Sequence, residues 1–266
     1  MGYAFDFSAV FDKEVYLRFY QDLLDDGASE KEVDEILLRS TRRPGKRLLD
    51  VSCRFGRHSN LLAGKGFRVT GVDTNPEFLK IARERASKEG LSLKYMEMDM
   101  RELPFEKEFD MVLSLFTSFG YFPDVDNEKV LDGISRALVP GGVFVLDIVN
   151  RDWVLSRGGR GTFVARNGED MMVTEDSYNP REDRLESRRA CLIGKEKKEM
   201  SMTLRLFSLK EITLRLEQHS LVVYDVRGNF RGDPFTMTSP RCILYCRKGS
   251  AGGGISEAWV PAFLPL

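Results

Sequence analysis

The chain has 266 residues, of which 42% are hydrophobic and 30% charged, a composition typical of a soluble protein with a large buried core. Its formal net charge of −1 supplies no global positive field that would concentrate nucleic acid or anionic lipid at the surface. Its apolar runs are interrupted before the roughly 20 residues that span a bilayer. We therefore expect a cytoplasmic protein with one sizeable domain, no membrane partner and no nucleic-acid partner.

Cysteine and histidine spacing disfavours a metal site. The chain contains no C-x-x-C pair, and its two histidines, His58 and His219, are far apart in sequence. A structural zinc site normally draws four ligands from such closely spaced pairs. We expect reduced, buried thiols and no metal.

Alternating strand and helix patterns begin after residues 1–40, which are expected to form an N-terminal helical cap with a helix from Ser29 onward. Apolar runs at 48–52, 67–73, 91–99, 109–116 and 143–149 predict five strands. One intervening helix has Pro76 in its first turn and Gly90 at its end, and another is expected over 126–139, ended by Pro140-Gly141-Gly142. Continuous apolar strands separated by helices indicate a parallel sheet covered on both faces.

The pattern changes to period-two alternation between residues 160 and 207, which predicts an antiparallel β insertion that we interpret as a lid. A helix over 209–220 and strands at 221–226 and 242–247 then complete a seven-stranded, Rossmann-like α/β sheet. The predicted core is therefore 41–159 with 208–248. Residues 249–266 are glycine-rich at their start and are expected to form a flexible tail.

Candidate binding residues follow the predicted strands, because ligands of open parallel sheets bind at the carboxyl ends of the strands. The first strand leads into a turn from Asp50 to Gly56, and Asp73 ends the second strand, 23 residues later. An acidic residue at about this spacing holds ribose hydroxyls in dinucleotide folds. Asp99 ends the third strand, and an aromatic loop, LFTSFGYF, follows the fourth. Each aspartate alone is equally compatible with a turn or helix-cap role, but their ordered spacing favours a site.

Taken together, these residues resemble the class I S-adenosylmethionine-dependent methyltransferases, in particular a subgroup with a GRH sequence after the first loop and an LFTSFGYF-like sequence after the fourth strand. The likeness is strong over residues 48–152 and looser beyond them. The family's first loop usually reads D-x-G-x-G-x-G, whereas this chain has Asp50, Ser52, Arg54 and Gly56 at those positions. Two of the three glycines are therefore replaced.

The resemblance implies S-adenosylmethionine as cofactor and a small-molecule acceptor. The implied cofactor-binding residues lie in the four strand-end loops: Asp50, Ser52, Arg54, Gly56, Arg57, Asp73, Thr74, Asp99, Met100, Leu115 and Phe116. The methionine part would lie over the first loop, the ribose on Asp73, the adenine beside Asp99 and Met100, and the sulfonium near Leu115 and Phe116. Acceptor-side candidates, which the sequence does not rank, are Tyr16, Tyr20, Tyr121, Asp147 and Asn150.

Three alternatives remain open. A pseudoenzyme that keeps the fold without tight cofactor binding is compatible with Ser52 and Arg54 in the first loop. A nicotinamide-dependent oxidoreductase is disfavoured, because the loop lacks G-x-G-x-x-G and no Tyr-x-x-x-Lys pair follows. A nucleic-acid acceptor is disfavoured too, because the basic residues between Arg181 and Lys198 are interspersed with acidic ones, as on a solvated strand surface. The sequence does not predict the oligomeric state.

Overall fold

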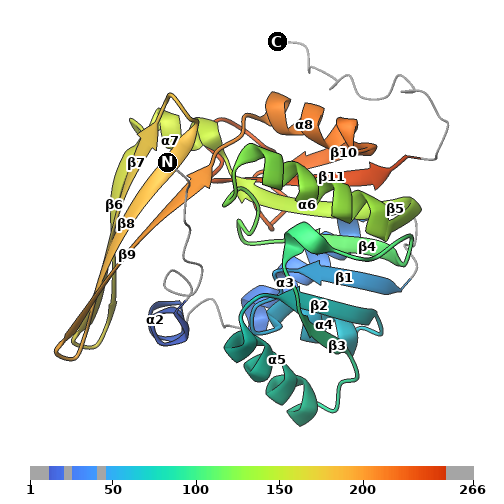
Figure 1. Cartoon of the computed structure of the whole chain (residues 1–266), viewed down its shortest axis with the longest axis horizontal. Helices are drawn as coiled ribbons and strands as arrows, with labels where there is room; N and C mark the ends of the chain where they lie inside the picture. The colour runs from blue at the N-terminus through green and yellow to red at the C-terminus, as the bar shows by residue number, and fades with distance from the viewer. Residues whose placement is uncertain (1–11, 21–25, 41–45, 250–266) are drawn as a thin grey trace.

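The computed structural model describes residues 12–20, 26–40 and 46–249. Its main sheet has the order β10-β11-β5-β4-β1-β2-β3. The strands are β1 (Arg47–Val51), β2 (Arg68–Asp73), β3 (Lys94–Glu97), β4 (Phe109–Ser114), β5 (Leu138–Val149), β10 (Leu221–Arg227) and β11 (Arg241–Lys248). Strands β1 to β5 pair in parallel, whereas β11 runs antiparallel to both β5 and β10. The predicted seven-stranded, mostly parallel sheet is confirmed (Figure 1). The predicted tail lies outside the described residues from residue 250 onward.

Helices cover both faces of this sheet. They are α3 (Asp26–Arg39), α4 (Arg57–Gly64), α5 (Pro76–Lys88), α6 (Asp124–Ala137) and α8 (Leu209–Gln218), with a short 3-10 turn, η2 (Met100–Glu102), after β3. One apolar cluster joins the sheet to α3 and α4 through Val33, Ile36 and Leu62. A separate cluster joins it to α6 and α8 through Ile134 and Ile212. Because helices bury both faces of the sheet, its strands form continuous apolar runs. No helix in the described ranges is long and apolar enough to cross a membrane.

A second, four-stranded antiparallel sheet follows the short helix α7 (Arg151–Ser156). Its strands, in the order β6-β7-β8-β9, are β6 (Arg160–Asn167), β7 (Asp170–Asn179), β8 (Arg184–Ile193) and β9 (Glu196–Arg205). The predicted antiparallel insertion is confirmed, and we keep the name lid for these four strands. Figure 1 shows the lid extending away from one end of the main sheet, with the N-terminal helix α2 beside it.

Helix α2 (Lys13–Phe19) joins the lid to the core. On one side, Val15 packs against Met172 and Cys191 of the lid. On the other side, Tyr16 packs against Phe55 and Phe78, with ring centroids 5.7 and 5.5 Å away. Helix α2 therefore bridges the lid and the core, whereas α3, the other described part of the predicted N-terminal cap, packs on the main sheet.

Several predicted boundaries are wrong. Strand β3 begins at Lys94 and not at residue 91, and β5 begins at Leu138 and not at residue 143. Helix α3 begins at Asp26, three residues before Ser29. Helix α6 ends at Ala137, and Pro140-Gly141-Gly142 lies inside β5 instead of forming the helix stop. The β4–β5 register shifts between Phe109↔Leu138 and Met111↔Val143, so the Pro-Gly-Gly segment is absorbed as an irregularity of the ladder. Glycine at φ +78° in Gly141 permits that bend.

Candidate functional site

The carboxyl ends of β1, β2 and β3 surround a cavity of about 540 Å³, which we call the outer cavity. Asp73 and Asp99 line it from the ends of β2 and β3, and Tyr121 lines it from the loop after β4. The other described lining residues are Asp12, Lys13, Ser52, Arg54, Thr74, Asn75, Pro76, Glu77, Phe78, Met98, Met100, Ser118 and Phe122. The structure thus brings together residues from all four loops that the sequence singled out.

The loop after β1 keeps a backbone suited to glycine at three alternate positions. Ser52, Arg54 and Gly56 have φ of +61°, +50° and +75°. A left-handed conformation costs a residue with a side chain about 1–2 kcal/mol, so glycine is the usual occupant. At Gly56 an added Cβ would also lie 2.1 Å from the hydroxyl oxygen of Tyr95. The loop therefore adopts a glycine-loop conformation although two of its three glycines are replaced.

Asp73 fixes this loop from the end of β2. Its Oδ2 accepts the backbone N–H of Arg54 at 2.9 Å, and its Oδ1 accepts that of Asn75 at 2.9 Å. The residue is only 9% exposed, and burial raises the pKa of its carboxyl, against the opposing effect of these backbone hydrogen bonds. A carboxylate offers about four acceptor positions, more than its backbone hydrogen bonds use, so Asp73 can also accept from a ligand in the outer cavity.

Asp99 and Asp50 have different environments. Asp99 is paired with Arg101, whose Nη2 lies 2.6 Å from its Oδ2. Burial raises the pKa of Asp99, but the hydrogen bonds from Arg101 outweigh burial and lower the pKa overall. Asp50 is buried and accepts a hydrogen bond from Ser59 Oγ at 2.6 Å, and its pKa is raised by desolvation. Asp99 is therefore a firmly ionised group beside the cavity, whereas Asp50 is a buried carboxyl whose charged form is disfavoured.

A second cavity of about 30 Å³, which we call the inner cavity, is also lined by the first loop. Its described lining residues are Tyr16, Asp50, Ser52, Cys53, Arg54, Phe55, Arg57, His58, Leu115 and Phe116. Arg54 lines both cavities, donates a hydrogen bond from its guanidinium to the hydroxyl of Tyr16, and lies 4.8 Å above the centroid of that ring. Arg54, in contact with Tyr16 of the inner cavity, therefore lies where the two cavities meet, as does Ser52.

The acceptor-side candidates fall into two groups. Tyr16 and Tyr121 line a cavity, and Tyr20 stacks on Tyr16 with centroids 4.8 Å apart. Asp147 and Asn150 line neither cavity. Asp147 is fully buried and accepts from Arg241 Nε at 2.7 Å. Asn150 caps α7 and donates to the carbonyl oxygen of Ser239 at 2.8 Å.

Other residues that lie in or beside the two cavities were not among the predicted site residues, although His58 belongs to the GRH sequence and Ser118 to the LFTSFGYF loop. His58 is buried in the first turn of α4, and its Nε2 lies 3.0 Å from Glu32 Oε2. Asp12 and Lys13 reach the outer cavity from the start of α2, and Ser118 reaches it from the aromatic loop. Asp12 is the N-cap of α2, and its approach to cavity residues about 40 to 110 positions away in sequence depends on tertiary packing.

The fold and the cavities define a Rossmann-like α/β protein with a ligand cavity at the carboxyl ends of its strands. The sequence profile of a family described as "Methyltransferase domain" matches residues 48–142. The cypemycin N-terminal methyltransferase of Streptomyces sp. is 30% identical over 222 residues, which cover 79% of this chain and 86% of that protein. This chain therefore belongs to the class I S-adenosylmethionine-dependent methyltransferase family.

Two further similarities extend the comparison. The glycine/sarcosine N-methyltransferase of Halorhodospira halochloris is 33% identical over 143 residues, and the match spans 52% of this chain and only 53% of that relative. A crystal structure of an S-adenosylmethionine-dependent methyltransferase from Clostridium acetobutylicum superposes with a TM-score of 0.76 at 19% identity, covering 89% of this chain and 97% of the other. At that identity the superposition establishes the shared fold.

Proposed function

We propose that this protein transfers a methyl group from S-adenosylmethionine to a small-molecule acceptor by direct in-line displacement. The observation that carries the proposal is the loop after β1, which keeps left-handed residues at positions 52, 54 and 56 beside a cavity lined by Asp73. A loop that holds two side-chain-bearing residues in this costly conformation is better explained by a retained binding surface than by packing alone.

The described residues fit the nucleoside part of this cofactor. In the proposed arrangement Asp73, with Thr74 beside it, accepts hydrogen bonds from the ribose hydroxyls, and Asp99 and Met100 flank the adenine in the outer cavity. Bonds from hydroxyls to a charged carboxylate contribute about 1.5–3 kcal/mol. The outer cavity, at about 540 Å³, falls within the roughly 300–1,000 Å³ range of small-molecule sites.

The methionine part places a further requirement on Arg54. The inner cavity, at about 30 Å³, has the volume of roughly one water molecule. A ligand that extends toward Leu115 and Phe116 therefore requires the side chains of Arg54 and Tyr16 to separate. We propose that the guanidinium of Arg54 then pairs with the methionine carboxylate, with Asp50 and Arg57 forming the wall of the site. Gly56, which the sequence also predicted to bind the cofactor, lines neither cavity and contributes the left-handed turn of the loop.

Positioning is the main task left to the protein, because the sulfonium supplies an activated methyl group and a neutral leaving group. Tyr16, Tyr20 and Tyr121 lie on the side of the site that faces α2 and the lid. Burial raises the pKa of Tyr20 and of Tyr121, so at neutral pH these phenols are uncharged donors and not bases. Holding the acceptor in line in a water-poor site contributes up to roughly 7–11 kcal/mol in ideal cases. We infer that α2 and the lid enclose the acceptor.

Nitrogen acceptors are the first class to test. The names of two relatives, a glycine/sarcosine N-methyltransferase and a cypemycin N-terminal methyltransferase, both specify amine acceptors. The GRH and LFTSFGYF sequences support placing this chain in a small-molecule subgroup of the family. Labelled S-adenosylmethionine should transfer its methyl group to members of a panel of amino acids, amino sugars and peptide N-termini.

Calorimetry with S-adenosylhomocysteine and NAD separates the proposal from its alternatives. S-adenosylhomocysteine should bind and NAD should not. Binding of NAD alone would indicate an oxidoreductase. The absence of binding to either compound would indicate a pseudoenzyme and refute the proposed activity.

A further inference from the structure

The loop between β4 and α6, residues 115–123, is attached to two different parts of the molecule. At its start, the N–H groups of Phe116 and Thr117 donate to the Oδ2 and the carbonyl oxygen of Asp147 at 2.8 and 3.1 Å. Both residues have positive φ, +55° and +58°, so this conformation is not the one the local sequence prefers. Ser118, Tyr121 and Phe122, which follow, line the outer cavity.

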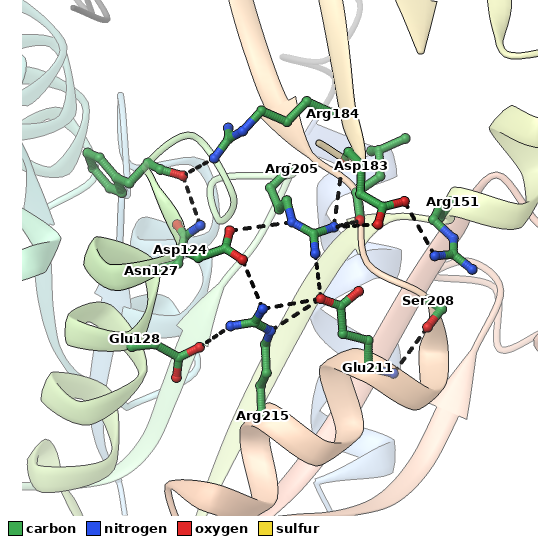
Figure 2. Close-up of polar contacts among 12 residues, drawn as sticks. Asp124, Asn127, Glu128, Arg151, Asp183, Arg184, Arg205, Ser208, Glu211 and Arg215 are labelled. Atoms are coloured by element: carbon green, nitrogen blue, oxygen red, sulfur yellow. Dashed lines mark hydrogen bonds and ion pairs between the residues drawn. The ribbon is translucent and has the colours of Figure 1, made fainter. Parts of the chain in front are cut away.

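At its end, the loop is bonded to the base of the lid (Figure 2). The carbonyl oxygen of Phe122 accepts Arg184 Nη2 from the start of β8 at 2.6 Å and Asn127 Nδ2 at 3.0 Å. The carbonyl oxygen of Gly120 accepts the backbone N–H of Arg205, at the end of β9, at 2.8 Å. A Cβ on Gly120 would lie 2.9 Å from the carbonyl oxygen of Arg205, and its φ is +106°. Glycine is therefore required for this close approach.

An ion-pair network fixes the base of the lid against the core. Arg205 Nη2 lies 2.5 Å from Glu211 Oε1 of α8, and its Nε lies 3.4 Å from Asp124 Oδ1 at the start of α6. Arg215 of α8 joins the same two carboxylates at 2.9 and 3.2 Å, as Figure 2 shows. The Arg205 side chain is 10% exposed, so the network is shielded from solvent more than an isolated surface pair.

We propose that Arg184 is a positioning residue that couples the lid to the ligand cavity. Arg184 is 6% exposed, and a buried hydrogen bond to a charged donor is costly to break. When the base of the lid moves, the guanidinium of Arg184 and the carbonyl of Phe122 move together, and Tyr121 and Phe122 shift in the cavity wall. Coupling between two sites is reciprocal, so a ligand that orders this wall also orders the base of the lid.

The test compares the full-length protein with Arg184→Met, which removes the donor and keeps the aliphatic volume, and Arg184→Lys, which restores one donor. Arg188→Met is the matched control, because Arg188 is exposed on the same strand. Hydrogen–deuterium exchange is followed over residues 115–123 and at Arg205, whose amide bonds to Gly120. Calorimetry measures the dissociation constant of S-adenosylhomocysteine. Of the two measurements, only this one rests on the proposed function.

Arg184→Met should speed exchange in these two segments while leaving β1 and β4 unchanged. It should weaken S-adenosylhomocysteine binding by about 2- to 30-fold, the range typical of coupled networks. Arg184→Lys should recover part of both effects, and Arg188→Met should show neither. In the unsubstituted protein, S-adenosylhomocysteine should slow exchange at Arg205, and Arg184→Met should reduce that slowing.

Two results would overturn the coupling: unchanged exchange at 115–123 and Arg205, or faster exchange spread equally through the core. Faster local exchange with unchanged S-adenosylhomocysteine affinity would also overturn it, because the loop would then move without affecting the cavity. If the unsubstituted protein binds no S-adenosylhomocysteine, the proposed function fails, and the exchange comparison between Arg184→Met and Arg188→Met decides the coupling by itself.

Discussion

Replacing Arg54 with glycine tests how the first loop holds the cofactor. Arg54 lies between the outer and inner cavities, with its guanidinium on the hydroxyl and ring of Tyr16. If that guanidinium turns to the methionine carboxylate, Arg54→Gly removes charge-assisted hydrogen bonds of about 1.5–3 kcal/mol. The dissociation constant of S-adenosylmethionine should then rise roughly 10- to 150-fold.

The stability of this variant should change much less than its affinity. Glycine at φ +50° relieves about 1–2 kcal/mol of left-handed strain. The same change removes a cation–π contact worth about 0.5–2 kcal/mol and adds roughly 0.5–1 kcal/mol of backbone entropy to the unfolded state. The opposing effects nearly cancel, so a large change in affinity would not be a consequence of unfolding.

Isothermal calorimetry at a fixed ionic strength is the assay, and two other variants are its controls. Ser52→Gly restores the family's glycine two residues away without removing the guanidinium, and it should leave affinity nearly unchanged. Arg54→Lys keeps the charge but not the bidentate fork and should give an intermediate loss. Tighter binding by Arg54→Gly would refute the reasoning, because it would show that Arg54 obstructs the site and would favour a pseudoenzyme.

Three further substitutions test the site and its support. Asp73→Asn should weaken S-adenosylhomocysteine binding about 10-fold or more in calorimetry, because the ribose hydroxyls lose a charged acceptor. Burial raises the pKa of Asp73, so the ionised carboxylate that binds the ribose exists only above this raised pKa. As pH is lowered, the affinity of the unsubstituted protein should therefore begin to fall at a higher pH than it would with an ordinary carboxyl. A pH profile identical to that of Asp73→Asn would contradict this assignment. Asp147→Ala should lower the free energy of unfolding by about 3 kcal/mol, because Arg241, whose side chain is 26% exposed, loses its carboxylate partner. The melting temperature measured by calorimetry should fall by about 6–12 °C. Gly56→Ala should destabilise the fold by about 2–5 kcal/mol in denaturant titration, since its Cβ meets Tyr95 and its φ is +75°; an unchanged midpoint would show that the loop relaxes freely.

The alternating pattern of the chain determined the main sheet and the position of the lid. Apolar strands separated by helices are consistent with few topologies, because parallel strands need crossovers that cover both faces. The loops after β1, β2, β3 and β4 were predicted for the same reason: strand ends meet at one edge of a parallel sheet. The structure brings Ser52, Asp73, Asp99 and Tyr121 around one cavity.

Local signals failed where long-range contacts decide the conformation. Pro140-Gly141-Gly142 is a helix stop by sequence, but the pairing of β5 with β4 places it within a strand. Asp147 and Asn150 share the polarity of ligand-binding residues, but only the packed structure shows that Asp147 faces Arg241 and that Asn150 caps α7. Sequence spacing carries no information about which buried polar groups satisfy one another.

The sequence by itself determined which loops surround the outer cavity, because local periodicity locates the ends of the strands, and the carboxyl ends of parallel strands lie at one edge of the sheet. Only the tertiary structure decided how the chain closes that site. Helix α2 reaches the cavity through Tyr16, and Arg184 reaches the carbonyl of Phe122 across 62 residues. The position of Arg54 between two cavities likewise depends on a φ of +50° that Asp73 stabilises from another strand. These contacts join segments that are distant in sequence, and their geometry is set by packing and by the hydrogen bonds that buried groups require.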